Sequence, residues 1–248
     1  ARDYGFGKAQ KMLGEFGARE VFVSAKYTPF THYKKGCVRK SLEKDLADFK
    51  RSDVDIYWLH LPTDIEEHLA EIIELYHEGK IKHVGVSNFT KEECELSKKI
   101  LEKAGIPLYG VQNHYSIICR DWENNGLLDW CKQNNILFWG WAVLEEGLLV
   151  DPRIKKSSTM KFTFKRKVKK LAPVYAEMIR IAEAHGIKVP QVAMAFCATK
   201  GVIPMCGCRK PEQVEALANA SKICLNEEEI RILETAADSA NVKIMGAD

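Results

Sequence analysis

The segment DIYWLHLPTDIEEHLAEIIELYHEGKIKHVGVSNF, residues 55–89, holds two apolar runs separated by an amphipathic stretch. The runs DIYWLHL (55–61) and HVGVSNF (83–89) are typical of buried strands. Gly79 lies between them as a helix stop, after apolar residues that recur at spacings of three and four: Leu69, Ile72, Ile73 and Tyr76. This spacing predicts a helix within 63–80, so the segment predicts two parallel strands joined by a helical crossover.

The same alternation continues along the rest of the chain. Four further runs are typical of strands: EVFVSAK (20–26), LYGVQNH (108–114), ILFWGWA (136–142) and GVIPMCG (201–207). Most of these runs are about 25 to 35 residues apart, with amphipathic, helix-like segments between them. Repetition of this kind predicts an α/β protein, either a doubly wound sheet or a (β/α)8 barrel.

Composition limits the classes of function. The 248 residues suffice for one large domain or two small ones, and the net charge of +3 is too small to favour nucleic acid or a membrane surface as the main partner. No apolar run reaches the roughly 18 residues that a membrane helix needs, and the N-terminal residues show no secretory signal pattern. Eight scattered cysteines favour free thiols and a cytoplasmic location. Only Cys206 and Cys208 are closely spaced, and no second Cys/His pair at zinc spacing accompanies them.

The longest irregular stretch, residues 143–170, precedes a helical pattern. It contains several Lys/Arg runs, the sequence Ser157-Ser158-Thr159 and two phenylalanines. Two interpretations stay open for it: a flexible, solvated loop, or a lid over a binding site.

Polar or aromatic side chains stand at the end of five strand-like runs. They are Lys26, His60, Ser87-Asn88, Gln112-Asn113 and Trp141. The carboxyl ends of the strands form the catalytic face of a barrel, so five such endings in succession predict an active site there.

Four stretches resemble the aldo-keto reductase family, and the resemblance runs from residue 1 to about residue 235. They are ARDYGFGKAQKMLGEF (1–16), VFVSAK (21–26), DIYWLH (55–60) and GKIKHVGVSNF (79–89), of which the last is the most specific. The resemblance implies a single (β/α)8 TIM barrel domain over residues 1–248. It further implies an NADP(H)-dependent enzyme that reduces small aldehydes or ketones to alcohols.

The resemblance also assigns three catalytic residues. Tyr4 matches the family's general acid, Lys26 the lysine beside it, and His60 the histidine that orients the carbonyl group. The roles agree with elementary chemistry, because a free tyrosine has a pKa near ~10 and a nearby ammonium group stabilises the phenolate that remains after proton donation.

Cofactor contacts follow from the same resemblance. Ser87, Asn88 and Gln112 would hydrogen-bond the nicotinamide carboxamide, and Trp141 would stack on the ring. The segment IPMCGCRKPEQVE (203–215) resembles the family's adenosine-phosphate segment, with the contacts Gly207, Cys208, Arg209, Lys210 and Gln213. Two cations there favour the 2′-phosphate of NADPH. A GxGxxG fingerprint is absent, which argues against a Rossmann dehydrogenase.

The chain departs from the family pattern at several points. The family's catalytic aspartate, five residues before the tyrosine, would precede Ala1, and we expect the first strands of the barrel to precede it too. Ala142-Val143 replaces a serine-proline pair, Cys208 replaces serine or threonine, and Leu217 stands where an asparagine is expected near the adenine. Each replacement removes a polar contact to the cofactor.

Two other functions stay open. One is a non-catalytic NADPH-binding sensor or regulatory protein of the same fold. The other is a phosphate-binding barrel lyase or isomerase, which offers no account of Trp141 together with Ser87-Asn88. The substrate is not readable, because the aromatic residues that could line an apolar pocket are equally plausible as core or surface residues: Tyr27, Phe30, Trp58, Tyr115 and Phe162.

Overall fold

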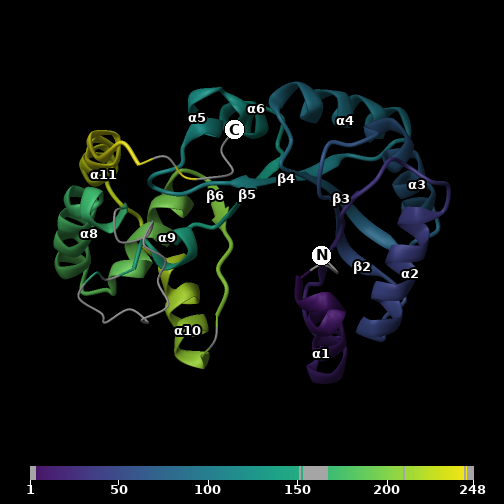
Figure 1. The fold of residues 1–248 in the computed structure, drawn as a ribbon, viewed down its shortest axis with the longest axis horizontal. Coiled ribbons are helices and arrows are strands. Elements are labelled where there is room, and N and C mark those ends of the chain that lie inside the picture. The colour runs from purple at the N-terminus through teal and green to yellow at the C-terminus, as the bar shows by residue number, and fades with distance from the viewer. Residues whose placement is uncertain (1–3, 151, 153–166, 209, 243, 245–248) are drawn as a thin grey trace. The chain divides into compact units, whose positions relative to one another are not determined.

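Strands and helices alternate along the chain, as the sequence predicts (Figure 1). The computed structural model describes residues 4–150, 152, 167–208, 210–242 and 244. By its contacts the chain divides into two compact units, Ala1–Gln112 with Asp129–Leu137 and Asn113–Leu128 with Phe138–Asp248.

The first unit is built on parallel strands that pair in chain order. They are β1 (Ser24–Tyr27), β2 (Val54–Leu59), β3 (Ile81–Ser87) and β4 (Leu108–His114), the last of which ends in the second unit. Lys26 is aligned with Trp58 across β1 and β2, and Ser87 with Gln112 across β3 and β4. This register brings the ends of the strands to one edge of the sheet.

Strand β1 begins four residues later than the sequence predicted. Val21 and Phe22 are about half exposed, and the Val23 N–H donates to the side-chain carboxylate of Asp55 at 2.8 Å instead of to a backbone oxygen of β2. Val21 and Phe22 are therefore apolar without being buried, whereas Val23 and Ala25 of the same run belong to the core.

The helices of the first unit follow their strands. They are η1 (Tyr4–Gly7), α1 (Lys8–Phe16), α2 (Cys37–Phe49), α3 (Ile65–His77) and α4 (Lys91–Lys103). The helix predicted within 63–80 is confirmed as α3, which buries Leu69, Ile72 and Leu75, and Gly79 follows it with a φ of 74°. Left-handed backbone of this kind favours glycine.

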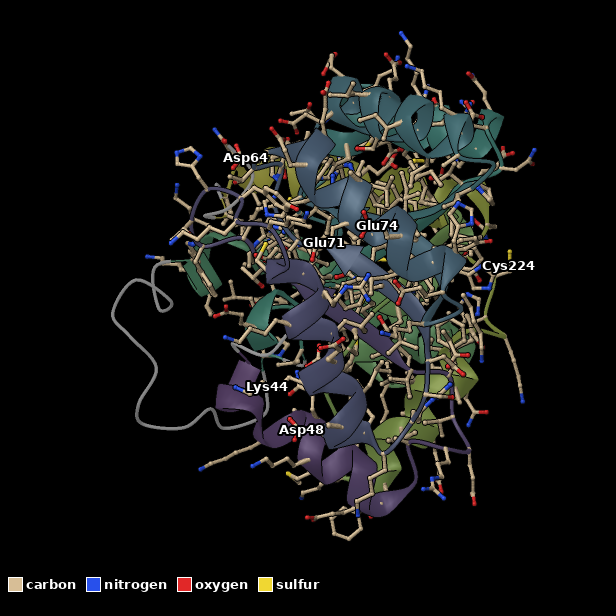
Figure 2. All side chains as sticks on the ribbon, turned by 90° about the vertical axis from the view of Figure 1, so that its right-hand side faces the viewer. Lys44, Asp48, Asp64, Glu71, Glu74 and Cys224 are labelled. Atoms are coloured by element: carbon tan, nitrogen blue, oxygen red, sulfur yellow. The ribbon has the colours of Figure 1, made fainter. Side chains whose placement is uncertain are left out.

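Helix α2 has no capping side chain of its own, because Gly36 precedes it. Glu71 of α3 takes that role: its carboxylate accepts hydrogen bonds from the backbone N–H groups of Val38 and Arg39 at 3.3 and 3.0 Å (Figure 2). A carboxylate at the N-terminus of a helix satisfies unpaired N–H groups and the helix dipole. It thereby ties α3 to α2 beside the sheet.

Trp58 fills the space next to Gly85 in the neighbouring strand. The tryptophan is fully buried and its Nε1 donates to Ser24 Oγ at 2.6 Å, so it belongs to the core and not to a substrate pocket. A Cβ at Gly85 would collide with the indole atoms Cε3 and Cζ3. The glycine of the GVSN stretch is therefore required by close packing.

The second unit contains two further parallel strands and most of the C-terminal helices. Its elements are β5 (Leu137–Trp141, of which Leu137 lies in the first unit), η2 (Glu145–Gly147), β6 (Val202–Pro204), α5 (Asp121–Asn124), α8 (Ala172–His185), α9 (Val189–Thr199), α10 (Pro211–Ala220) and α11 (Glu227–Ala240). Helix α6 (Leu127–Gln133) is shared between the units. Strand β6 is shorter than the predicted 201–207, because Pro204 lacks an N–H group and the chain beyond it is irregular.

Candidate functional site

A buried lysine joins the ends of three strands in the first unit. Lys26, at the end of β1, is buried, and its Nζ donates to Ser87 Oγ at 3.2 Å and to Gln112 Oε1. Ser87 and Gln112 are themselves buried at the ends of β3 and β4. Three residues predicted for the site from separate strand ends therefore meet, because parallel strands bring their carboxyl ends to one edge.

Asn88 connects the cluster around Lys26 to His60, the residue that follows β2. Its Nδ2 donates to the His60 backbone oxygen at 3.0 Å and to Ser87 Oγ at 3.2 Å, and its N–H donates to the Gln112 backbone oxygen at 3.1 Å. The backbone of Asn88 is left-handed, with a φ of 61°. Asparagine adopts this conformation more readily than other side-chain-bearing residues, which explains its place after Ser87.

His60 is held by the loop that follows β1. Its N–H donates to the Tyr27 backbone oxygen at 2.9 Å, and its ring atom Nδ1 lies 2.7 Å from Thr28 Oγ1. The sequence analysis missed Thr28. Its position two residues after Lys26, on a loop at the catalytic edge, was the available signal.

Tyr4 is described only through its backbone, which belongs to η1. Its side chain lies outside the described part of the chain, as do Arg209 and Phe162, so the expectations for these groups stay predictions. Most of the 143–170 stretch, namely residue 151 and residues 153–166, also lies outside it.

The first unit offers a fitting environment for a carboxamide. Within the described residues, Gln112 Nε2 is buried and has no hydrogen-bond partner. A buried amide donor without a partner costs free energy unless a ligand or water accepts its hydrogen bond. A carboxamide oxygen is an acceptor of the required kind, and Ser87 and Asn88 lie beside Gln112.

Trp141 ends strand β5 in the second unit. Its indole stacks on the imidazole of His114, with ring centroids 4.3 Å apart and planes at 17°. The imidazole Nε2 donates to Glu145 Oε1 at 2.9 Å, and Ser116 Oγ donates to the same oxygen. The sequence analysis missed this pairing, because the residues are far apart in the chain and carry no shared motif.

The segment predicted to bind the adenosine phosphate lines a cavity of about 320 Å³ in the second unit. The wall includes four of the predicted contacts, Gly207, Cys208, Lys210 and Gln213, together with Lys188. Gln213 also accepts a hydrogen bond from the Lys210 N–H at 3.2 Å and so caps α10. A Cβ on Gly207 would meet no protein atom within 4 Å, so a ligand can approach this backbone closely.

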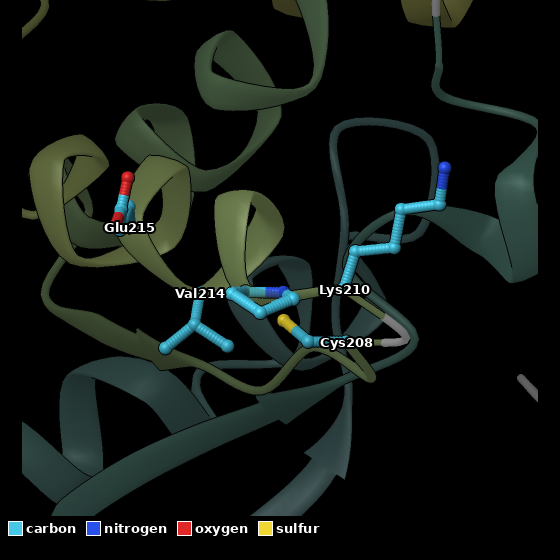
Figure 3. A pocket seen from close by; sticks show the side chains of 5 residues that line it. Cys208, Lys210, Val214 and Glu215 are labelled. Atoms are coloured by element: carbon cyan, nitrogen blue, oxygen red, sulfur yellow. The ribbon is translucent and has the colours of Figure 1, made fainter.

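A second, more open hollow of about 590 Å³ shares Cys208 and Lys210 with this cavity and lies at α10 (Figure 3). Cys208, Lys210 and Val214 line it, and the lysine side chain extends away from the helix. Burial and the neighbouring Cys208 raise the pKa of Cys206 to about 12, so that its thiol is protonated near neutral pH. In the wall of the 320 Å³ cavity, Lys188 and Lys210 supply positive charge and Glu212 a negative one, while Cys206 is neutral.

The described residues contain no group of three or more His, Cys, Asp or Glu side chains placed to hold a metal ion. No helix among them is long and apolar enough to cross a membrane.

The chain belongs to the aldo/keto reductase family, whose family model matches residues 1–238. The fold is accordingly that of the (β/α)8 barrel reductases, and the structure of a glycerol dehydrogenase from Gluconobacter oxydans matches with a TM-score of 0.84 at 23% identity. That match covers 98% of this chain and 81% of the other.

Two curated relatives show the same family at the level of sequence. The aldo-keto reductase YhdN of Bacillus subtilis is 26% identical over 94% of this chain and 76% of its own length. The aldo-keto reductase yakc [NADP(+)] of Schizosaccharomyces pombe is 24% identical over 96% of this chain and 77% of its own length. Membership in an oxidoreductase family agrees with the site predicted from the strand ends.

Proposed function

We propose that this protein is an NADP(H)-dependent oxidoreductase that reduces aldehydes or ketones to alcohols. The observation that carries the proposal is the buried cluster of Lys26, Ser87 and Gln112, joined through Asn88 to His60. A charged lysine is rarely buried unless it is paired or hydrogen-bonded, because removing an ammonium group from water costs free energy. A positive charge held at the catalytic edge suits a reaction in which negative charge develops on oxygen.

The chain's own residues would handle the proton and the carbonyl group. Lys26 is fixed by two hydrogen bonds, and its charge would favour the phenolate of Tyr4 and so assist proton donation by that tyrosine. His60, held at Nδ1 beside Thr28, would present Nε2 to the substrate oxygen and orient it. NADPH, when bound, supplies the hydride.

Each unit by itself offers groups that suit part of the cofactor. In the first unit, Gln112 Nε2 provides a buried donor for a carboxamide, beside Ser87 and Asn88. In the second unit, Trp141 provides an aromatic face on which a nicotinamide ring could stack. The adenosine phosphate would occupy the cavity lined by Gly207, Cys208, Lys210 and Gln213, with Arg209 as a further predicted cation. Lysine favours the 2′-phosphate of NADP(H), and the name of the S. pombe relative carries NADP(+).

The test measures NADPH oxidation with a panel of aldehydes and ketones. We expect Tyr4→Phe to lower kcat by about 10²–10⁴-fold, the usual contribution of a general acid, while the Kd for NADPH changes little. Tyr76→Phe on α3 is the matched control, since that tyrosine is only partly buried and is no member of the proposed site, and it should leave kcat unchanged. Turnover unaffected by Tyr4→Phe would contradict the assigned acid.

The sensor function is the second outcome of the same experiment. Tight NADPH binding without turnover of any substrate, in the wild type and the variant alike, would replace the reductase by a non-catalytic NADPH-binding protein.

A further inference from the structure

A buried carboxylate follows the strand that carries Trp141. Glu145 is only 4% exposed, and its Oε1 accepts hydrogen bonds from His114 Nε2 at 2.9 Å and from Ser116 Oγ. His114 and Ser116 are buried as well. Burying a carboxylate is costly unless it is paired and hydrogen-bonded, so these contacts are what allow Glu145 to lie here.

The turn that carries Glu145 has an unusual backbone. Ala142, Glu145 and Glu146 all have left-handed backbone, with φ values of 56°, 46° and 51°. The Glu145 N–H donates to the Ala142 backbone oxygen at 2.7 Å and closes the turn. Residues with a Cβ pay conformational strain in this region, and such strain persists only where surrounding contacts enforce it. The buried side chain of Glu145 is the contact that anchors the turn.

The same contacts reach two parts of the proposed cofactor site. His114, held by Glu145, covers one face of the Trp141 indole, and the N–H of Tyr115 donates to the Trp141 backbone oxygen at 3.2 Å. Leu144, the residue before Glu145, lines the cavity assigned to the adenosine phosphate. A substitution at Glu145 should therefore alter both the orientation of the Trp141 indole and the position of Leu144 in the cavity wall.

We infer that Glu145 is a positioning residue for the cofactor: through His114 it sets the orientation of Trp141, and through the turn it sets the position of Leu144. We assign Glu145 a positioning role and not a catalytic one, since its hydrogen bonds go to His114 and Ser116. The inference rests on the proposed function, in which Trp141 stacks on the nicotinamide ring. Glu145 lies in none of the stretches that resemble the family's motifs, and the inference gives it a specific role in nucleotide binding.

The test compares Glu145→Gln with Glu146→Gln. The two variants make the same chemical change at adjacent left-handed positions, but Glu146 is exposed. We expect Glu145→Gln to raise the Kd for NADPH about tenfold, the effect of losing one hydrogen bond to a charged group, and to change the quenching of tryptophan emission when NADPH binds. Glu146→Gln should stay within about twofold of the wild type.

A double-mutant cycle separates positioning from general stability. In a Trp141→Ala background, Glu145→Gln should have much less effect on the Kd for NADPH, because the indole on which it acts is gone. An equal effect in both backgrounds, or a lowered melting temperature with an unchanged Kd, would overturn the inference. If Glu145→Gln does not fold, His114→Gln gives the same comparison, since it removes the stacking ring but keeps an N–H donor for Glu145. A Kd unchanged by His114→Gln would overturn the inference as well.

Failure of the two proposals can be told apart. If the wild type binds neither NADPH nor NADP+, the proposed function fails and the inference falls with it. If the wild type binds NADPH and Glu145→Gln binds it equally well, only the inference fails.

Discussion

Gly85 gives the sharpest test of the packing beneath the candidate site. It lies in β3, two residues before Ser87, with the indole of Trp58 against its backbone. Replacing it by alanine adds one methyl group. That group would lie 2.5 Å from Trp58 Cζ3, closer still to Cε3, and 3.1 Å from the Gly110 backbone oxygen.

The expected cost follows from these distances. Carbon atoms in contact are normally about 3.5–4.0 Å apart, so the methyl group would overlap the ring by about 1 Å. Trp58 is fully buried and cannot move without displacing its neighbours. Overpacking of this kind costs about 1–3 kcal/mol, and a displaced ring also weakens its 2.6 Å bond to Ser24 Oγ, worth about 1 kcal/mol. We expect Gly85→Ala to lower the free energy of unfolding by about 2–4 kcal/mol.

The assay is urea unfolding followed by far-ultraviolet circular dichroism, together with thermal unfolding. For a chain of this size the melting temperature should fall by roughly 5–15 °C. Gly207→Ala is the matched control, because a Cβ there meets no protein atom and the backbone is not left-handed. Its free energy of unfolding should stay within about 0.5 kcal/mol of the wild type.

A double mutant tests whether the collision with Trp58 is what destabilises Gly85→Ala. Trp58→Phe removes the indole atoms that the methyl group would strike, so Gly85→Ala should cost much less in that background. The reasoning is refuted if Gly85→Ala unfolds with the wild-type midpoint, or if its cost is the same beside Trp58 and Phe.

Two further predictions concern the site and its support. Thr28→Val keeps the shape of the side chain but removes the hydroxyl beside His60 Nδ1, so kcat should fall about 3–10-fold with little change in the Kd for NADPH; an unchanged kcat would show that Thr28 does not orient the ring. Burial tends to raise the pKa of Asp55, but the Val23 N–H, Lys82 and other cations outweigh it and leave that pKa below its ordinary value. The stabilisation from Asp55 is therefore complete above the unfolded pKa near ~3.9 and is lost as pH falls through the lower folded pKa. Urea midpoints of Asp55→Asn should be lower than those of the wild type at neutral pH and converge with them in acid; a constant difference down to pH ~2 would contradict this.

The order of strands and helices was largely predictable, because the pattern behind it is local. The apolar spacing over 63–80 predicted α3, and all six predicted strands are confirmed. Strands β1 and β6 are much shorter than expected, and β2 and β5 are shorter by one or two residues. The predicted ends of β1 and β6 were wrong, because the local pattern of residues does not show which apolar residues are buried. Val21 and Phe22 are apolar yet remain exposed.

Part of the site was predictable for a related reason. In a parallel sheet every strand ends at the same edge, so Lys26, Ser87 and Gln112 could be assigned to one cluster from their places in the strand-like runs alone. Whether an aromatic residue lines a pocket or fills the core could not be predicted in this way. Trp58 and Tyr115 are fully buried, whereas Phe30 is largely exposed.

The sequence by itself determined the alternation of strands and helices, the family, and the residues that end the strands, since these depend on residue type and spacing along the chain. Only the tertiary structure decided which side chains meet. The contact of Thr28 with His60, the cover of Trp141 by His114, and the burial of Glu145 all join residues at least 27 positions apart. Such contacts depend on how the elements pack against one another. Packing and hydrogen bonding between residues far apart in the chain produce no periodic pattern in the sequence, so they cannot be predicted from it.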